Sequence, residues 1–390
     1  MAERNVVISG VGQSDVGKRV ARGALALTID AVKEALDDAG LSVADIDGLS
    51  SFPGYRPDQP GFAPFGLMPL KEAMGFRLNW FSGGGEGPVQ MQPIIDGYAA
   101  IKAGLARHVL CFRTVQEGSG GRSYANTVAS VERPRAGGDF QWIHPFDAPS
   151  AVNWLALHAQ RHFTQYGTTR EQLAQVALVQ RNNARLNPKA IFTDPMSLDD
   201  YMGARMISTP LCLFDCDAPT DASTVLILSA DDAARDTKSR PLRIEAISGA
   251  LHSDASWAKF DIARGAAFDS AQRMWAATDL KPGDIDVALL YDGFSFLTLR
   301  WIEALGLCGV GEGGAFIEGG HRIGRDGSFP INPHGGQLSA GRTHGFGFAH
   351  EAVLQLRGAA GARQLPRDLS TAVVAMGGGP KCGCMLLVKD

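Results

Sequence analysis

The chain has 390 residues, of which 45% are hydrophobic and 20% are charged. A single hydrophobic core stops growing near ~250–300 residues, so we expect at least two cores. The 37 basic and 41 acidic side chains give a net charge of −4 without a long run of either sign, which argues against a nucleic-acid-binding surface. No apolar run approaches the ~18 residues that span a bilayer, and the N-terminus lacks the apolar segment of a signal peptide. We therefore expect a cytoplasmic protein that binds neither nucleic acid nor membrane.

Gly and Pro residues divide the chain into alternating strand-like and helix-like segments, which is typical of an α/β fold. In chain order, the first half contains a helix over 24–39, a glycine-rich turn over 83–87 that opens a helix through 103, and strands over 108–112 and 224–228. Pro88 suits the first position of that second helix. The second half contains a helix over 266–278, a turn over 341–345 that opens a helix to about 357, and strands over 371–376 and 384–388.

Two short motifs repeat at the same offset of 239 residues. Ile8-Ser9-Gly10 recurs as Ile247-Ser248-Gly249, and Asp45-Ile46-Asp47 recurs as Asp284-Ile285-Asp286. Each pair of motifs encloses one amphipathic helix. The sequence therefore predicts two homologous halves, residues 1–239 and 240–390.

The segment over about 115–210 has no counterpart in the second half. It contains helical stretches over 154–166 and 169–184, and it reads as an inserted cap over the first core. Long insertions on rigid scaffolds commonly bind substrate. The two glycine-rich turns open helices whose N-termini carry unpaired N–H groups, so two such turns facing each other suit anionic oxygen.

The six cysteines show no metal-binding spacing. No Cys-x-x-Cys pair occurs, and no His pair lies beside a cysteine, so we expect reduced, mostly buried thiols and no metal site. The glycine-rich turn over 83–87 also lacks the pattern of a dinucleotide-binding or P-loop turn, which sets nicotinamide and nucleoside triphosphate cofactors aside.

Several motifs are shared with one known family. They are Arg185-Leu186-Asn187-Pro188-Lys189-Ala190, Asp215-Cys216-Asp217-Ala218-Pro219-Thr220-Asp221-Ala222, Asn332-Pro333-His334-Gly335-Gly336 and Gly377-Gly378-Gly379. On these motifs the chain resembles the thiolase superfamily, within it the sterol-carrier or lipid-transfer-protein branch, over nearly its whole length. The resemblance implies a duplicated thiolase fold, a five-layer αβαβα arrangement with an inserted cap, and a homodimer.

The chain departs from the thiolase pattern at each catalytic position. No cysteine occurs between Gly83 and Ala103, where thiolases carry their nucleophile, and Ala375 stands at the second cysteine position. Tyr291 stands at the Asn or His position that precedes x-x-Phe. Arg342 lies in the turn that matches Gly-His-Pro, and His344 follows it. Without a thiolate at either place we expect a sulfur-free reaction chamber and no acyl-enzyme.

This substitution pattern resembles the thiolase-like aldolases of steroid side-chain degradation. The resemblance implies retro-aldol cleavage of a β-hydroxyacyl-CoA, a 17-hydroxysteroid side-chain thioester, to a 17-ketosteroid and a short acyl-CoA such as propionyl-CoA. It also implies a small partner protein with an OB-fold domain and a zinc ribbon. Coenzyme A is part of the substrate, so no separate cofactor is expected.

Retro-aldol cleavage needs a base at the hydroxyl, a polar cradle for the thioester enolate and an acid at the α-carbon. We assign Tyr291 as the base or hydrogen-bonding group, with Arg342 as a source of phenolate stabilisation, because a free phenol titrates near ~10 and a base near ~7 is needed. His344 is the candidate acid or enolate-side donor. The backbone N–H groups near Gly378 and those of the turn over 84–87 are candidates for the cradle.

Each assignment has a structural alternative. Tyr291 can be a strand-end tyrosine bonded to backbone, and His344 a buried structural histidine. Arg342 can simply pair with a carboxylate. Glu86 is an acid or a first-turn charge that favours the helix dipole. Asp292 orients Tyr291 or caps the following helix.

Two other functions remain open at this point. One is a cysteine-free thiolase-like acyltransferase, which would exchange acyl groups rather than release a ketone. The other is a catalytically silent thiolase-like scaffold that stabilises a partner subunit.

Overall fold

The computed structural model describes residues 5–57, 59–85, 87–120, 140–148, 150–252 and 265–390. Within these residues the main sheet has nine strands in the order β3-β2-β4-β7-β1-β8-β11-β10-β9. Its strands are β1 (Val6–Gln13), β2 (Gly48–Ser51), β3 (Trp80–Gly83), β4 (His108–Gln116), β7 (Asp221–Ala230), β8 (Leu242–Leu251), β9 (Val287–Leu290), β10 (Thr371–Gly377) and β11 (Lys381–Val388). A separate two-stranded sheet pairs β5 (Met206–Ser208) with β6 (Leu211–Cys212).

The helices fall into two sets, those of the two halves and those of the cap. Those of the two halves are α1 (Ala24–Ala39), α2 (Leu67–Met74), α3 (Gln92–Lys102), α9 (Ala266–Trp275), α10 (Ser295–Ala304), α11 (Gly313–Ile317) and α12 (Phe346–Arg357). Those of the cap are α5 (Phe140–Ile143), α6 (Ala151–Tyr166), α7 (Arg170–Ala184) and α8 (Leu198–Met202). Short 3-10 turns include η1 (Val43–Asp45), η2 (Val89–Met91), η3 (His144–Phe146), η4 (Leu213–Asp215) and η7 (Pro282–Asp284).

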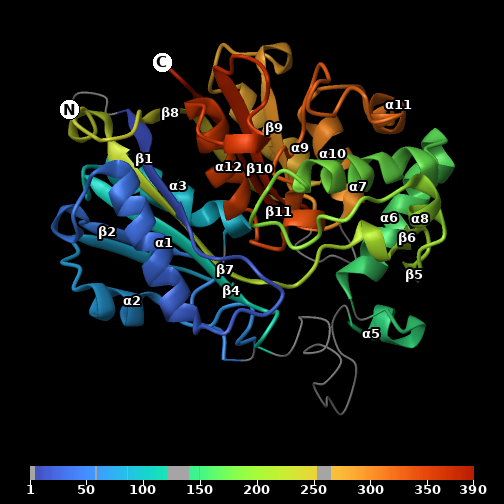
Figure 1. Ribbon diagram of the computed structural model, residues 1–390. Coiled ribbons are helices and arrows are strands. Elements are labelled where there is room, and N and C mark those ends of the chain that lie inside the picture. The colour runs from blue at the N-terminus through green and yellow to red at the C-terminus, as the bar shows by residue number, and fades with distance from the viewer. Residues whose placement is uncertain (1–4, 58, 86, 121–139, 149, 253–264) are drawn as a thin grey trace.

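Three hydrophobic cores separate five layers. The first core packs α1 and α2 on the outer face of the N-terminal strands, and the third packs α9 and α10 on the outer face of the C-terminal strands. The middle core contains α3 and α12 and receives side chains from both sets of strands. This is the duplicated αβαβα arrangement that the family resemblance implies. Figure 1 shows the N-terminal half in blue to cyan, the C-terminal half in orange to red beside it, and the green cap helices beyond.

The same hydrogen-bonding pattern occurs in both halves. Asp47, just before β2, accepts from the backbone N–H groups of Arg107 and His108 at the start of β4, both at 2.9 Å. Asp286, just before β9, accepts from the N–H groups of Ser370 and Thr371 at the start of β10, at 2.7 and 2.9 Å. The repeated Asp-Ile-Asp motif therefore fixes the same strand pair in each half. The halves join where β1 pairs with β8 at Val7–Arg243 and Ile8–Leu242.

Local sequence signals account for most helix limits. α1 ends at Gly40, whose φ of 70° lies in the left-handed region that glycine adopts without strain. α7 begins with a capping box in which the Thr169 side chain accepts from the N–H of Gln172. The expected helices over 24–39, 154–166 and 169–184 match α1, α6 and α7 to within a few residues.

The expected role of Pro88 is wrong. It precedes the 3-10 turn η2, and α3 begins only at Gln92, with a different proline, Pro93, in its first turn. The reason is that Pro88 adopts a ψ of 49°, which does not continue into a helix.

The cap is anchored to the C-terminal half by Asp215, which is fully buried. Its carboxylate accepts from the hydroxyls of Tyr201 and Ser295 and from the backbone N–H of Cys212. These contacts join α8, η4 and the start of α10. No helix among the described residues is long and apolar enough to cross a bilayer.

Candidate active site

A cavity of about 770 Å³ lies between the cap and the two halves, within the usual size range of small-molecule sites. Most of its wall is apolar, and its polar groups gather at the loops that follow β4, β9 and η4. Its described lining residues are Phe62, Gln90, Glu117, Ser150, Ala151, Val152, Trp154, Arg205, Ile207, Leu213, Cys216, Asp217, Pro219, Tyr291, Gly293, Phe294, Arg342 and His344. Three of the six predicted site residues, Tyr291, Arg342 and His344, therefore meet here.

A buried network of charges forms one wall of the cavity. Glu117, one residue after β4, accepts from Nη1 of Arg342 at 3.2 Å and lies 3.1 Å from Nε2 of His344. Asp217 accepts from Nη2 of the same arginine at 2.5 Å. Burial acts to raise the pKa of Glu117, but the positive charges of Arg342 and Arg113 and the hydrogen bond with His344 hold it well below its usual range. Glu117 is therefore a carboxylate at neutral pH.

His344 is held as a neutral imidazole with one free nitrogen. Burial lowers its pKa to about 4, against the raising effect of Glu117. Because ionised Glu117 can only accept, Nε2 carries the proton and donates to it, so Nδ1 bears a lone pair. Nδ1 is buried and has no hydrogen-bond partner among the described residues. His344 also has a φ of 49°, a conformation that costs a non-glycine residue energy and that the surrounding contacts must maintain.

Tyr291 lies at the end of β9, where its backbone N–H donates to the carbonyl of Ala375 at 3.1 Å. Its ring covers Gly293 and contacts Phe348 edge-on, with 6.2 Å between ring centroids. Burial, and then the charge of Asp217, raise the pKa of Tyr291 above its ordinary value, although Arg342 acts to lower it. Arg342 therefore acts on the phenol in the expected direction, but burial outweighs it, and Tyr291 is a neutral donor at rest.

Asp292 is fully buried and belongs to another turn. Its carboxylate accepts from the backbone N–H groups of Gln337 and Leu338, at 2.8 and 3.2 Å. The following helix α10 has no side-chain cap. Both roles predicted for Asp292 are therefore corrected, because it holds the turn Gly336–Ala340. Burial raises the pKa of its carboxyl group to about 8.

Of the two remaining predicted residues, Gly378 does not line the cavity. A Cβ on Gly378 would lie 2.4 Å from the Leu297 side chain, so this glycine packs against α10 and is not among the residues that line the cavity. Glu86 lies outside the described residues. The turns themselves do approach each other, because a Cβ on Gly345 would lie 3.4 Å from that of Gln90.

Sequence reasoning missed Glu117, Asp217 and Arg113. The guanidinium of Arg113 is buried, donates from Nη1 to the carbonyl of Thr114, and has no partner for Nε or Nη2 in the described part of the chain. Burial lowers its pKa to about 10, and the nearby Glu117 and Tyr291 oppose that shift. A charged residue within the largely apolar strand 108–115 was the available signal for Arg113.

The expectation of a sulfur-free chamber is also corrected, because Cys216 lines the cavity. Burial raises the pKa of this thiol, and its Sγ lies 3.6 Å from the carbonyl oxygen of Cys212. The residue sits in the cap motif beside Asp217 and not on either glycine-rich turn. A thiol that resists ionisation is a poor acyl acceptor.

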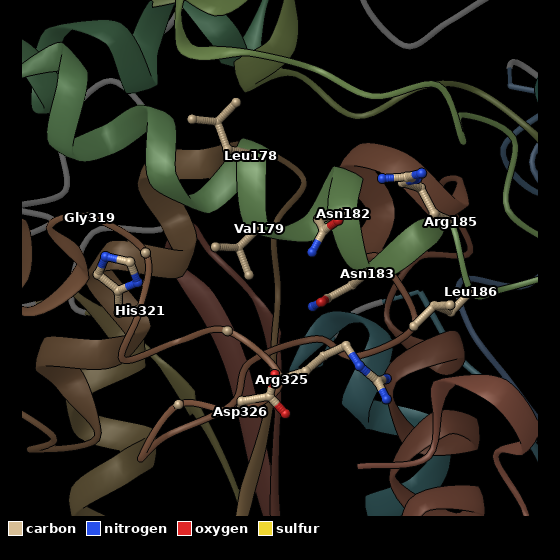
Figure 2. Close-up of a pocket in the computed structure, with 13 residues that line it drawn as sticks. Leu178, Val179, Asn182, Asn183, Arg185, Leu186, Gly319, His321, Arg325 and Asp326 are labelled. Atoms are coloured by element: carbon tan, nitrogen blue, oxygen red, sulfur yellow. The ribbon is translucent and has the colours of Figure 1, made fainter. Parts of the chain in front are cut away.

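Another cavity, of about 810 Å³, lies between α7 and the loop over 319–327. Figure 2 shows Asn182, Arg185, His321 and Arg325 around it, with Leu178 and Val179 on its helical side. None of the predicted site residues lines it, so it does not share in the chemistry derived from the turns.

Comparison with known proteins identifies the family of this chain. Residues 249–388 match the family described as Thiolase C-terminal domain-like. The sequence is 33% identical to the steroid side-chain-cleaving aldolase of Thermomonospora curvata, over 98% of this chain and 97% of that protein. It is 32% identical to the 17-hydroxy-3-oxo-4-pregnene-20-carboxyl-CoA lyase of Mycobacterium tuberculosis, over 92% of this chain and 93% of that protein.

Solved structures give the same result. The Ltp2-ChsH2(DUF35) aldolase matches with a TM-score of 0.87 and 31% identity, over 99% of this chain and 98% of that chain. Human mitochondrial 3-ketoacyl-CoA thiolase, 15% identical with a TM-score of 0.69 over 99% of this chain and 98% of that chain, shares the fold. The chain therefore belongs to the thiolase superfamily, in its thiolase-like lyase branch of steroid side-chain-cleaving aldolases.

Proposed function

We propose that this protein is an aldolase that cleaves the side chain of a 17-hydroxysteroid CoA thioester, releasing a 17-ketosteroid and propionyl-CoA. The observation that carries the proposal is the meeting of Tyr291, His344 and the carboxylate of Glu117 at the wall of a mostly apolar cavity. Retro-aldol cleavage requires a base and a hydrogen-bond donor but no nucleophile. The reaction needs no cofactor beyond the coenzyme A of the substrate.

The protonation states favour His344 as the base, the reverse of the assignment made from the sequence. Nδ1 of His344 takes the proton of the 17-hydroxyl, and Glu117 stabilises the imidazolium through Nε2. The bond between C17 and the α-carbon then breaks, leaving a ketone and a thioester enolate. Return of the same proton from Nδ1 to the α-carbon gives the acyl-CoA and restores the neutral imidazole.

The enolate oxygen needs hydrogen-bond donors that are not already paired within the protein. The neutral phenol of Tyr291 is one, since its raised pKa keeps its proton in place. Nη2 of Arg113 is buried without a partner among the residues described here, but Arg113 does not line the cavity. Tyr291 is therefore the enolate-side donor that the cavity geometry supports.

The test is incubation of the purified protein with 17-hydroxy-3-oxo-4-pregnene-20-carboxyl-CoA, followed by chromatography of both products. We expect a 17-ketosteroid and propionyl-CoA in equal amounts. Acyl exchange with added thiols or acyl-CoA, without ketone, would establish the cysteine-free acyltransferase instead. No turnover, alone or with a co-expressed partner, would establish the scaffold.

Two variants test the assigned roles. Tyr291→Phe and His344→Gln are each expected to lower kcat by roughly a hundredfold or more, the usual worth of one acid–base or oxyanion contact. Thermal melting serves as the folding control. Near-normal cleavage by a folded Tyr291→Phe or His344→Gln protein would remove that residue from the mechanism.

We further propose that the protein is a homodimer paired at the edge strand β3. This strand ends the described sheet, and its Phe81 is 59% exposed. An apolar edge strand left open is a site for pairing with another chain. The β3 edges of two protomers would join their sheets.

We also propose an OB-fold, zinc-ribbon partner, because the structure with the highest similarity quoted above is that of an Ltp2-ChsH2(DUF35) complex. The cap exposes Phe146, Leu157 and Leu213, which are 80%, 71% and 45% exposed, and Leu213 also lines the cavity. We propose that the partner covers these exposed apolar side chains. We also propose a cytoplasmic location for this activity.

A further inference from the structure

A buried arginine lies behind the wall of the active-site cavity and takes no direct part in the proposed chemistry. Arg113, in β4, is 3% exposed and does not line the cavity. Its guanidinium donates from Nη1 to the carbonyl of Thr114 at 2.9 Å, while Nε and Nη2 have no hydrogen-bond partner among the described residues. Burying a charge without full hydrogen bonding costs free energy, so a group of this kind requires an explanation.

Arg113 reaches the proposed base through an aromatic ring. Its Cζ lies over the ring of Phe62, 4.6 Å from the ring centroid, and Phe62 lines the cavity. The same ring meets the imidazole of His344 edge-on, with 4.7 Å between the ring centroids and 83° between the planes. The cation and the imidazole therefore share one buried contact, where charges act on each other more strongly than they do in water.

The charges of the buried network balance only when Arg113 is counted. Glu117 and Asp217 supply two negative charges, and Arg342, which pairs with both, supplies one positive charge. Arg113 supplies the second, because burial lowers its pKa only to about 10 and so leaves it charged at neutral pH. With His344 neutral, the network has no net charge. Loss of the charge on Arg113 would leave one negative charge in excess, which a proton on the imidazole of His344 would neutralise.

Resting on the proposed function, we infer that Arg113 is a positioning residue whose buried positive charge keeps His344 unprotonated and whose contact with Phe62 holds that ring against the imidazole. An unprotonated Nδ1 is what the base needs to accept the proton of the 17-hydroxyl. Arg113 acts from behind the cavity wall and touches no substrate. Of the titratable groups near Arg113, the phenol of Tyr291 is neutral at rest.

The groups around His344 give the effect of Arg113 a definite sign. Burial, Arg113 and Arg342 act to lower the pKa of His344, whereas Glu117 acts to raise it. Asp217 acts through Arg342, with which it pairs. Removing the positive charge of Arg113 therefore raises the pKa of His344, which is the opposite of the effect of removing the negative charge of Glu117.

Arg113→Met tests the charge with an uncharged, flexible side chain. We expect the acidic limb of kcat/KM to move up by roughly one pH unit or more. The same shift is expected in an NMR titration of His344 in the resting protein, where its signal among the nine histidines is assigned by its absence from His344→Gln. Arg357→Met is the control, because the side chain of Arg357 is 6% exposed and pairs with Asp38. This control is expected to leave the limb in place.

A double variant keeps the inference testable if Arg113→Met does not fold. Arg113→Met/Asp217→Asn removes one charge of each sign, so we expect it to fold and to return the acidic limb toward its wild-type position. An Arg113→Met limb that stays in place or moves to lower pH would overturn the inference. Failure of both variants to fold would also overturn it, because Arg113 would then serve stability alone.

The NMR titration separates this inference from the proposed function. If Arg113→Met raises the pKa of His344 in a protein that cleaves no steroid thioester, the aldolase is refuted and the charge balance is retained. If the protein cleaves the thioester and Arg113→Met leaves the titration of His344 unmoved, the charge balance alone is refuted.

Discussion

At the scale of single residues, the chemistry of the cavity depends on Glu117, which no sequence motif indicates. It is 6% exposed, and it fixes both the tautomer of His344 and the position of Arg342. Glu117 and Arg342 are 225 positions apart in the chain. A pairing of this kind cannot be read from one sequence, because neither residue has a local partner that marks its role. Asp217 does lie in a motif shared with the family, but the motif does not reveal its pairing with Arg342, 125 positions away.

A first prediction concerns the pH dependence of cleavage. Since burial lowers the pKa of His344 to about 4, the base stays neutral and kcat/KM should be flat between pH 5 and pH 8. The pKa of His344 in the folded protein lies below its ordinary value near ~6.5. The contribution of His344 to stability therefore decreases as the pH falls from about 6.5 to about 4. Rates are therefore measured on protein shown to be folded at each pH. A fall centred near 6.5 would contradict the assignment.

Replacement of Glu117 tests the same pH dependence through the partner of His344. Glu117→Gln removes the negative charge that stabilises the imidazolium, and we expect kcat to fall by about 10- to 100-fold, as for other residues that orient a reacting histidine. The loss of the negative charge also lowers the pKa of His344 further, so the acidic limb of the profile moves to lower pH. The exposed Glu72→Gln serves as control and is expected to leave the profile unchanged. A shift of the limb to higher pH would show that Glu117 does not act on His344.

The cavity thiol gives a second residue-scale prediction. Cys216→Ser is expected to change kcat by no more than about threefold, because the thiol is held protonated and no step requires it. Mass spectrometry during turnover should detect no acylated protein. An inactive, folded Cys216→Ser enzyme together with an acyl adduct in the wild type would restore a thiolase-type route.

At the scale of elements, the sequence predicted the paired glycine-rich turns but not what they hold. Helix periodicity and glycine placement are local signals, and they located α12 and its preceding turn to within one residue. The placement of Asp292 on the turn Gly336–Ala340 was missed because it depends on glycine at a distant position. A Cβ on Gly336 would lie 2.1 Å from the Asp292 carboxylate.

A matched pair of glycine variants tests the turn that carries His344. Gly345 has a φ of 87°, and a Cβ there would lie 3.0 Å from Met376 Cγ. Gly358, at the other end of α12, has a φ of 70° and open space around its Cβ. Both Gly→Ala changes are expected to cost about 1–2 kcal/mol of stability for the left-handed conformation. Only Gly345→Ala is expected also to lower kcat, because it displaces the residue next to His344. Equal kinetics in the two variants would show that the turn does not position the histidine.

At the scale of the whole molecule, the fold was the most predictable property. The repeat at 239 residues and the alternation of strands and helices imply two stacked α/β units, and the five layers follow from burying both faces of each set of strands. The surfaces that bind other chains could not be predicted from these patterns. In the sequence, an exposed apolar residue such as Phe81 looks the same as an apolar residue of the core.

The proposed dimer gives a prediction at this scale. Phe81→Asp places a charge on the open edge of β3, which opposes edge-to-edge pairing of strands. We expect sedimentation velocity to show a species of half the wild-type mass, with an unchanged circular dichroism spectrum. Leu105→Asp, an exposed residue that follows α3, is the control. A wild-type protein that sediments as a monomer would refute the dimer directly.

The narrow join between β1 and β8 has a consequence for how the two halves can be separated. In the described sheet β1 and β8 share two residue pairs, yet α3 and α12 bury a common core that neither half can close by itself. A gene cut between codons 239 and 240 is therefore expected to give two polypeptides that aggregate when made alone and recover solubility when made together. Because Glu117 comes from one piece and His344 from the other, the return of catalysis would report their reassembly.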